Sequence, residues 1–311
     1  MGNISKLLLL FSLQYCCFIA CGALPTIFTS ISIDESALLA IKSQITHDPY
    51  NILATNWTKE FISTNYFYGF IPYEIGHLKR LRYLHMQLNA LSGQIPKSLG
   101  HLTRMEELIL YNNSLSGPIP QSIFNISSLR AIDLMYNFLN GTLPEDICST
   151  NCLAWAAGRL DMMSSGNSSV LEVIEIGVNE FYGCLPDDMC FSHPNLEWLE
   201  LTYTQLSGQI TSSLSHSRAL CRIHLSSNNF SGSIPPEIVN MSALQVLLLS
   251  NNSLTGELTL PSSSNLSALK TLDSHRNLLS GSLPPDLGFR FPNLEVLNLG
   301  SNQFSGKIPA E

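Results

Sequence analysis

The sequence predicts an α/β repeat solenoid, because three features of one unit recur along most of its 311 residues. The unit is clearest in residues 220–239, which read LCRIHLSSNNFSGSIPPEIV. It combines alternating apolar residues, a fixed asparagine and a Gly-x-Ile-Pro segment. A repeat of roughly 20 to 50 residues is typical of solenoids, in which each coil packs only on its neighbours.

The period is measured from the fixed asparagine, which is Asn228 in this unit. The residues equivalent to it are Asn89, Asn113, Asn137, Asn179, Thr204, Asn252, Asn277 and Asn302. The nine positions are separated by 24, 24, 42, 25, 24, 24, 25 and 25 residues, so only one interval breaks the period. Residues 148–168 lie in that interval without a repeat signature, and they form either a decayed coil or an insertion.

Each unit predicts a short strand followed by two turns. Alternation places Leu108 and Leu110 inward, and Glu107, Ile109 and Tyr111 outward, on a growing parallel sheet. The amides of the fixed asparagines should bond buried backbone groups and form a ladder through the stack, to which Thr204 contributes only in part. The Gly-x-Ile-Pro segment then turns the chain into a short helical turn.

The N-terminal residues predict secretion and a cap. Residues 1–23 combine Lys6, an apolar run and small residues, as in a signal peptide; the alternative is a membrane anchor. Residues 32–60 predict an amphipathic helix and an extended segment ending near Trp57, which together cap the solenoid. The solenoid itself spans residues 66–311, with a truncated first coil, about nine recognisable repeats and no closing cap.

The composition excludes several functions. A net charge of -8 and a pI near 5.5 argue against nucleic acid as a partner. The eight cysteines become five without the signal peptide; Cys148 with Cys152 and Cys184 with Cys190 are possible disulfides, and their spacing does not favour zinc. No catalytic grouping occurs at motif spacing, so we expect no enzyme activity, no metal and no cofactor.

The string LSGxIPxxLGxLxxLxxLxLxxN closely resembles the plant-specific leucine-rich repeat. The N-terminal phrase ALLAIKSQITHDPYNILATNW looks most like the ectodomains of plant receptor-like kinases of the immune-sensing group. This resemblance implies a right-handed superhelix with a concave parallel sheet and short helical or 3-10 turns on the convex side. It also implies a peptide or protein ligand on the concave wall and a possible co-receptor kinase with similar repeats.

The chain departs from that family in two respects. The cap lacks the cysteine pair expected soon after Trp57, and the kinase motifs GxGxxGxV, VAIK and DFG are absent. The chain therefore resembles an ectodomain truncated before the membrane helix and kinase, and we expect contact with a membrane only through a C-terminal segment that this sequence does not include. We expect it in the secretory pathway, either outside the cell or at the plasma membrane of a complete receptor.

The outward residue four before each fixed position should form one column along the sheet. Three consecutive recognisable units place a carboxylate there, and aromatic and basic residues flank them, which suggests a patch for a basic or amphipathic peptide. The alternative is that these are merely solvated strand residues. The candidate ligand-binding residues are Tyr111, Asp133, Met135, Glu175, Trp198, Glu200, Thr202, Arg222, His224 and His275.

Sequons for N-glycosylation are abundant, and some should stack along the convex side so that the wall stays open. They are Asn56, Asn112, Asn125, Asn140, Asn167, Asn229, Asn240, Asn251 and Asn265. The pattern leaves three interpretations: the ligand-recognition module of a defence or developmental receptor, a secreted inhibitor of a cell-wall-degrading enzyme, or a non-functional receptor fragment.

Overall fold

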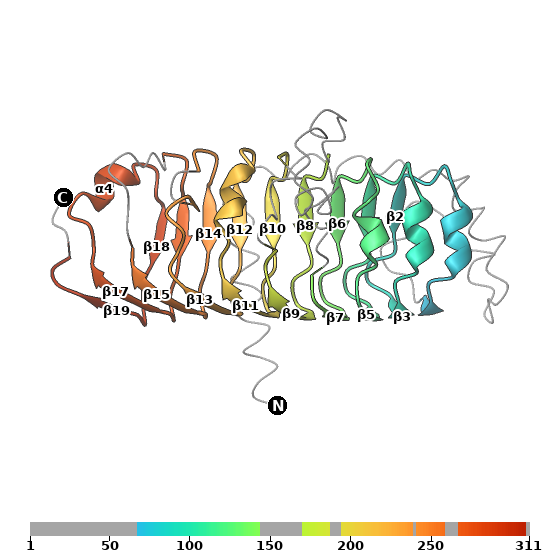
Figure 1. Ribbon diagram of the computed structural model, residues 1–311, viewed down its shortest axis with the longest axis horizontal. Coiled ribbons are helices and arrows are strands. Elements are labelled where there is room, and N and C mark those ends of the chain that lie inside the picture. The colour runs from blue at the N-terminus through green and yellow to red at the C-terminus, as the bar shows by residue number, and fades with distance from the viewer. Residues whose placement is uncertain (1–66, 144–169, 187–193, 239–240, 259–266, 309–311) are drawn as a thin grey trace, which may run out of the picture. The chain divides into compact units, whose positions relative to one another are not determined.

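The structure is a computed structural model that describes residues 67–143, 170–186, 194–238, 241–258 and 267–308. The expected signal peptide (1–23), N-terminal cap (32–60) and irregular stretch (148–168) lie outside the described residues. All described residues belong to one compact unit, Ala40–Glu311. They form a solenoid of stacked coils, as predicted, with two parallel sheets running along the stack (Figure 1).

The first sheet has nine strands of three residues, each built from the alternating apolar segment of one coil. Its strands are β2 (Tyr83–His85), β4 (Glu107–Ile109), β6 (Ala131–Asp133), β8 (Val173–Glu175), β10 (Trp198–Glu200), β12 (Arg222–His224), β14 (Val246–Leu248), β16 (Thr271–Asp273) and β18 (Val296–Asn298). The central residue of each strand points inward, and from Leu84 to Leu272 it is at most 2% exposed. A fully buried leucine contributes roughly 1.5–3 kcal/mol, so this column is a main source of stability.

The second sheet follows the fixed asparagines and has ten strands. They are β1 (Tyr68–Phe70), β3 (Ala90–Gln94), β5 (Ser114–Gly117), β7 (Phe138–Gly141), β9 (Glu180–Cys184), β11 (Gln205–Gln209), β13 (Asn229–Gly232), β15 (Ser253–Glu257), β17 (Leu278–Ser282) and β19 (Gln303–Ser305). Among its inward residues, Phe181 and Phe230 are completely buried. The core therefore lies between the two sheets and the helical turns.

Short helical turns complete the coils. They are η3 (Tyr73–His77), η4 (Lys97–His101), η5 (Gln121–Ile123), η9 (Ser212–His216) and α4 (Leu287–Arg290). Proline precedes the first three, and its restricted φ suits the residue before a helical turn. Thr211 replaces this proline before η9 with a similar φ of -73°, and its Oγ1 accepts a hydrogen bond from the Ser213 N–H at 3.2 Å. The sequence departure at Thr211 therefore still caps the turn.

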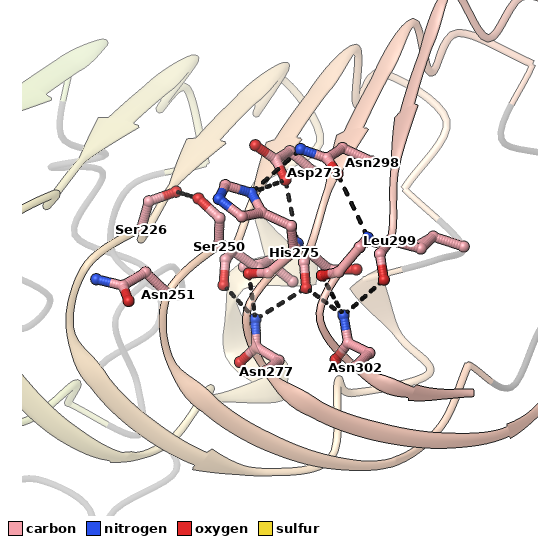
Figure 2. A network of polar contacts seen from close by, with 12 residues as sticks. Ser226, Ser250, Asn251, Asp273, His275, Asn277, Asn298, Leu299 and Asn302 are labelled. Atoms are coloured by element: carbon pink, nitrogen blue, oxygen red, sulfur yellow. Dashed lines mark hydrogen bonds and ion pairs between the residues drawn. The ribbon is translucent and has the colours of Figure 1, made fainter. Parts of the chain in front are cut away.

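The fixed asparagines are bonded as a ladder. Asn277 Nδ2 donates to its own coil at Ser274 O (3.0 Å) and to the preceding coil at Leu249 O (2.9 Å), while its Oδ1 accepts from Leu254 N–H (2.9 Å). Asn302 repeats the pattern one coil further, as Figure 2 shows. Each rung satisfies buried or partly buried backbone groups of two coils, and so it couples neighbouring coils.

The 42-residue interval does not separate the stack. β6 pairs directly with β8, so that Asp133 lies opposite Glu175, and β7 pairs with β9. Asn179 Nδ2 also donates to Leu134 O at 2.9 Å across the same junction. The coils of Asn137 and Asn179 are therefore neighbours, and no strand of the first sheet lies between them.

Candidate functional site

We call the outward-facing side chains of the nine-stranded sheet the outer face. Its strands pair without any shift in register, so the third residues of all nine strands form one straight column. In order, the column contains His85, Ile109, Asp133, Glu175, Glu200, His224, Leu248, Asp273 and Asn298. Adjacent strands lie roughly 4.8 Å apart, so side chains in the column are direct neighbours.

Three carboxyl groups stand side by side at the centre of this column. Asp133, Glu175 and Glu200 lie on β6, β8 and β10, and their exposed fractions are only 8%, 8% and 5%. The interpretation of these residues as solvated strand positions is therefore wrong. Their neighbours on the sheet remove most of the water that carboxylates usually bind.

Burial changes the protonation of two of these groups. Loss of water, with a smaller effect from the charge of Glu200, raises the pKa of Asp133 to about 7, although the Met135 N–H bond opposes the shift. Burial also raises the pKa of Glu175 well above its usual value, and the charges of Asp133 and Glu200 add to this effect. The centre of the outer face therefore carries less negative charge near neutral pH than its sequence indicates.

The trio is bounded on one side by an aromatic and two basic side chains. The Arg222 guanidinium lies over the Trp198 ring, 4.7 Å from its centroid, in a cation–π contact. His224 Nδ1 contacts the carboxyl group of Glu200, which also accepts the Thr202 N–H at 3.0 Å. Trp198 and Thr202 are buried, whereas Arg222 and His224 are half-buried.

The remaining candidates lie at varying distances from the trio. Tyr111 and Met135 are neighbours, because the Asn112 N–H donates to Met135 O at 2.9 Å, and both are half-buried beside the trio. His275 lies on the coil of β16, three coils beyond that of Thr202. There it contacts Asp273 at 2.7 Å and Asn298 at 3.2 Å, as Figure 2 shows. The structure therefore does not bring His275 to the trio.

Two features of the outer face were not identified from the sequence. His85 Nε2 contacts Glu107 Oε2 at 2.9 Å, a polar contact between outward positions of adjacent units. Gly177 replaces the outward side chain found in most other coils. A Cβ there would lie 2.8 Å from Thr202 O, so only glycine permits this approach of the two coils.

Other predicted sites are described only in part. The sequons Asn112, Asn125, Asn140, Asn229 and Asn251 are exposed, and Asn56, Asn167, Asn240 and Asn265 lie outside the described residues. Among the described residues, Cys184 and Cys221 form no disulfide, and Cys148, Cys152 and Cys190 of the possible disulfides lie outside that part of the chain. The described segments contain no group of three or more His, Cys, Asp or Glu side chains suited to a metal ion. No helix that they form has the length and apolar character for crossing a bilayer.

A family model described as Leucine Rich Repeat matches residues 80–102, 104–126, 219–241 and 293–311. No curated protein matches the chain. The family match and the stacked coils together identify the solenoid as a leucine-rich-repeat fold.

Solved structures extend the comparison. The Arabidopsis receptor kinase HAESA, in complex with the peptide hormone IDA and the co-receptor SERK1, has 31% identity and a TM-score of 0.69, over 79% of this chain and 38% of that one. The plant peptide hormone receptor RGFR1, in complex with RGF2, has 32% identity and a TM-score of 0.66, over 79% and 40%. The chain thus spans about two fifths of each receptor structure.

A third solved structure has a different activity. A plant ice-binding protein has 26% identity to the chain and a TM-score of 0.64, over 78% of this chain and 71% of that one. The same fold therefore occurs in receptors for peptide hormones and in an ice-binding protein, so the fold alone does not indicate a ligand. The side chains of the outer face have to indicate it.

Proposed function

We propose that the chain is the extracellular ligand-recognition module of a plant cell-surface receptor-like kinase, which binds a peptide or protein along the outer face. The observation that carries the proposal is the unbroken register of nine strands, which aligns varied side chains on an otherwise repeating scaffold. The inward leucines and ladder asparagines repeat because they build the coil, whereas the outward residues differ from coil to coil. The similarity to two receptors solved with peptide hormones supports this proposal.

The centre of the face has the composition of a protein-binding surface. Trp198 supplies a large aromatic group, and Arg222 is held over it, which are the two residue types most often found at energetic centres of interfaces. Rigid strands hold these groups, so a ligand pays little entropy to order them. A co-receptor kinase with similar repeats and a role in defence or development are parts of the same proposal.

Selection from a random peptide library displayed on phage, with the chain immobilised, tests this function. The first variant is Glu175→Lys with Glu200→Lys, and the matched control is Glu180→Lys with Glu257→Lys, which changes the charge equally on exposed positions of the ten-stranded sheet. We expect selected peptides to lose binding to the first variant and to keep binding to the control. Because Glu200 is buried, Arg222→Ala at the half-buried margin provides a second variant, and thermal denaturation checks that each variant folds.

Equal binding to all the variants would place the ligand elsewhere. Sequencing the complete transcript then separates the remaining interpretations of the chain. A receptor predicts a membrane helix and a kinase downstream, and a secreted inhibitor of a cell-wall-degrading enzyme predicts a closing cap and a stop codon. A non-functional fragment predicts neither expression nor folding.

A further inference from the structure

Glu175 is the carboxyl group of the outer face that lacks a donor. Among the described residues, its side chain makes neither a hydrogen bond nor an ion pair, although its exposed fraction is only 8%. It lies at the centre of the trio, with Asp133 opposite on one side and Glu200 opposite on the other. A buried carboxylate without a donor is costly, because it loses water and gains no replacement.

The other carboxyl groups in the outward columns each have a donor. Glu107 contacts His85 at 2.9 Å, and Asp273 contacts His275 at 2.7 Å. Glu200 pairs with His224 and accepts the Thr202 N–H, and Asp133 accepts the Met135 N–H at 3.1 Å. The fold thus satisfies carboxylates on this face as a rule, and Glu175 is the exception among the described residues.

We propose that the carboxylate of Glu175 receives one cationic group of the ligand, the ammonium of a lysine or N-terminus or the guanidinium of an arginine. This inference rests on the proposed function, since it names the chemistry that the outer face recognises. A cationic donor supplies the missing hydrogen bond and also offsets the repulsion from Asp133 and Glu200. A neutral donor at this point would supply only the hydrogen bond, and an anionic group would supply neither effect.

The neighbouring side chains limit where the rest of the ligand lies. Arg222, one strand beyond Glu200, stacks on Trp198 and attracts Glu175 only at a distance, without forming an ion pair with it. Its fixed charge repels a second cationic group on that side. The ligand therefore presents its cationic group at β8 and apolar or acidic groups toward β12.

Binding of a cation is also linked to protons. The charged groups facing Glu175 are Asp133 on β6, Glu200 on β10 and Arg222 on β12, and the two carboxyl groups keep its pKa raised together with burial. A cation binds the deprotonated form, so binding releases protons and becomes tighter as the pH rises. The linkage predicts weaker binding at pH 5 than at pH 8.

The test uses peptides selected from the random library on the full chain, and then Glu175→Gln, which keeps the shape of the side chain. Glu257→Gln, at an exposed position of β15, is the matched control. We expect the selected peptides to share a lysine or arginine and to bind Glu175→Gln about 10-fold to 100-fold more weakly, as for loss of a charged hydrogen bond. Glutamine substitution of that basic residue in the peptide should weaken binding to the wild-type chain equally, and should have no further effect on Glu175→Gln.

The possible failures are distinguishable. Selected peptides without basic residues, or with unchanged affinity for Glu175→Gln, overturn this inference and leave the proposed function intact. If no peptide is enriched on the wild-type chain, or if binding survives charge reversal of the outer face, the proposed function falls and this inference with it. Thermal denaturation of Glu175→Gln should show unchanged or higher stability, because the substitution removes a carboxyl group whose ionised form is buried and repelled by Asp133 and Glu200.

Discussion

Thr204 interrupts the ladder, and restoring an asparagine there should stabilise the junction of two coils. In the next coil, Asn228 Oδ1 accepts from Leu206 N–H at 3.2 Å, and its Nδ2 donates to Leu201 O at 2.8 Å. Thr204 forms neither equivalent bond, since its hydroxyl contacts Leu201 O at 3.3 Å and Asn228 Oδ1. The N–H of Phe181 therefore lacks the ladder acceptor, whereas the carbonyl of Ile176 keeps the bond from Asn179 Nδ2 at 3.0 Å and lacks the second one.

In Thr204→Asn, the asparagine side chain is similar in size to threonine and supplies both a hydrogen-bond acceptor and a donor at this buried position. Each restored hydrogen bond contributes about 1 kcal/mol, so the substitution should raise the free energy of unfolding by about 2 kcal/mol. The corresponding rise in Tm is about 4 to 8 °C for a chain of this size. Because repeat arrays can unfold in parts, hydrogen exchange at the Phe181 amide is the sharper assay, with an expected slowing of about 30-fold.

The matched control is Thr255→Asn, at an exposed position of β15 outside the ladder, which should leave Tm and exchange unchanged. The converse substitution, Asn228→Thr, should cost about 2 kcal/mol by removing the same pair of bonds. Unchanged exchange at Phe181, in a variant whose new side chain occupies the ladder position, would refute the reasoning.

Three further substitutions have expected outcomes. Val178 has a φ of 52°, which strains a β-branched residue. Val178→Asn should therefore raise the free energy of unfolding, measured by denaturant titration, by about 1 kcal/mol. A lower free energy of unfolding would show that the packing of the valine side chain outweighs the strain. Ser274 is fully buried and its Oγ lacks a partner among the described residues, so Ser274→Ala should stabilise by about 1 kcal/mol, whereas destabilisation would indicate a bound water. The pKa of the Asp133 carboxyl is about 7 in the folded chain and about 4 in the unfolded chain, so the folded chain binds its proton more tightly. The free energy of unfolding should therefore fall by up to about 4 kcal/mol as the pH rises from about 4 to about 7. Asp133→Asn should flatten that dependence in melts across this pH range, and an unchanged slope would assign it to another group.

Much of the scaffold could be predicted from the repeat alone. Because side chains alternate along a strand, the pattern places Leu108 inward and Ile109 outward, and the register puts Ile109 in the outward column between His85 and Asp133, where its neighbours bury it. The fixed spacing also predicts which outward residues share a column, since coils of equal length stack in register. Thr204 was expected to contribute only in part, and its bonds show this limit.

The environment of the candidate site could not be predicted in the same way. The sequence shows Asp133, Glu175 and Glu200 as outward carboxylates, which ordinarily remain solvated. Their burial depends on neighbours in other coils, and one of these junctions crosses the 42-residue interval that breaks the period. The role of Gly177 could not be predicted either, because its close contact with Thr202 appears only when the two coils stack.

The sequence by itself determined the architecture, because alternation and period are local properties that every coil repeats. It also showed which residues build the coil and which are free to vary. The tertiary structure alone decided that β6 pairs with β8, that three carboxyl groups lose their water together, and that Glu175 has no donor among the described residues. The reason is physical: the charge state and hydrogen bonding of a side chain depend on what surrounds it, and here the surroundings come from other coils.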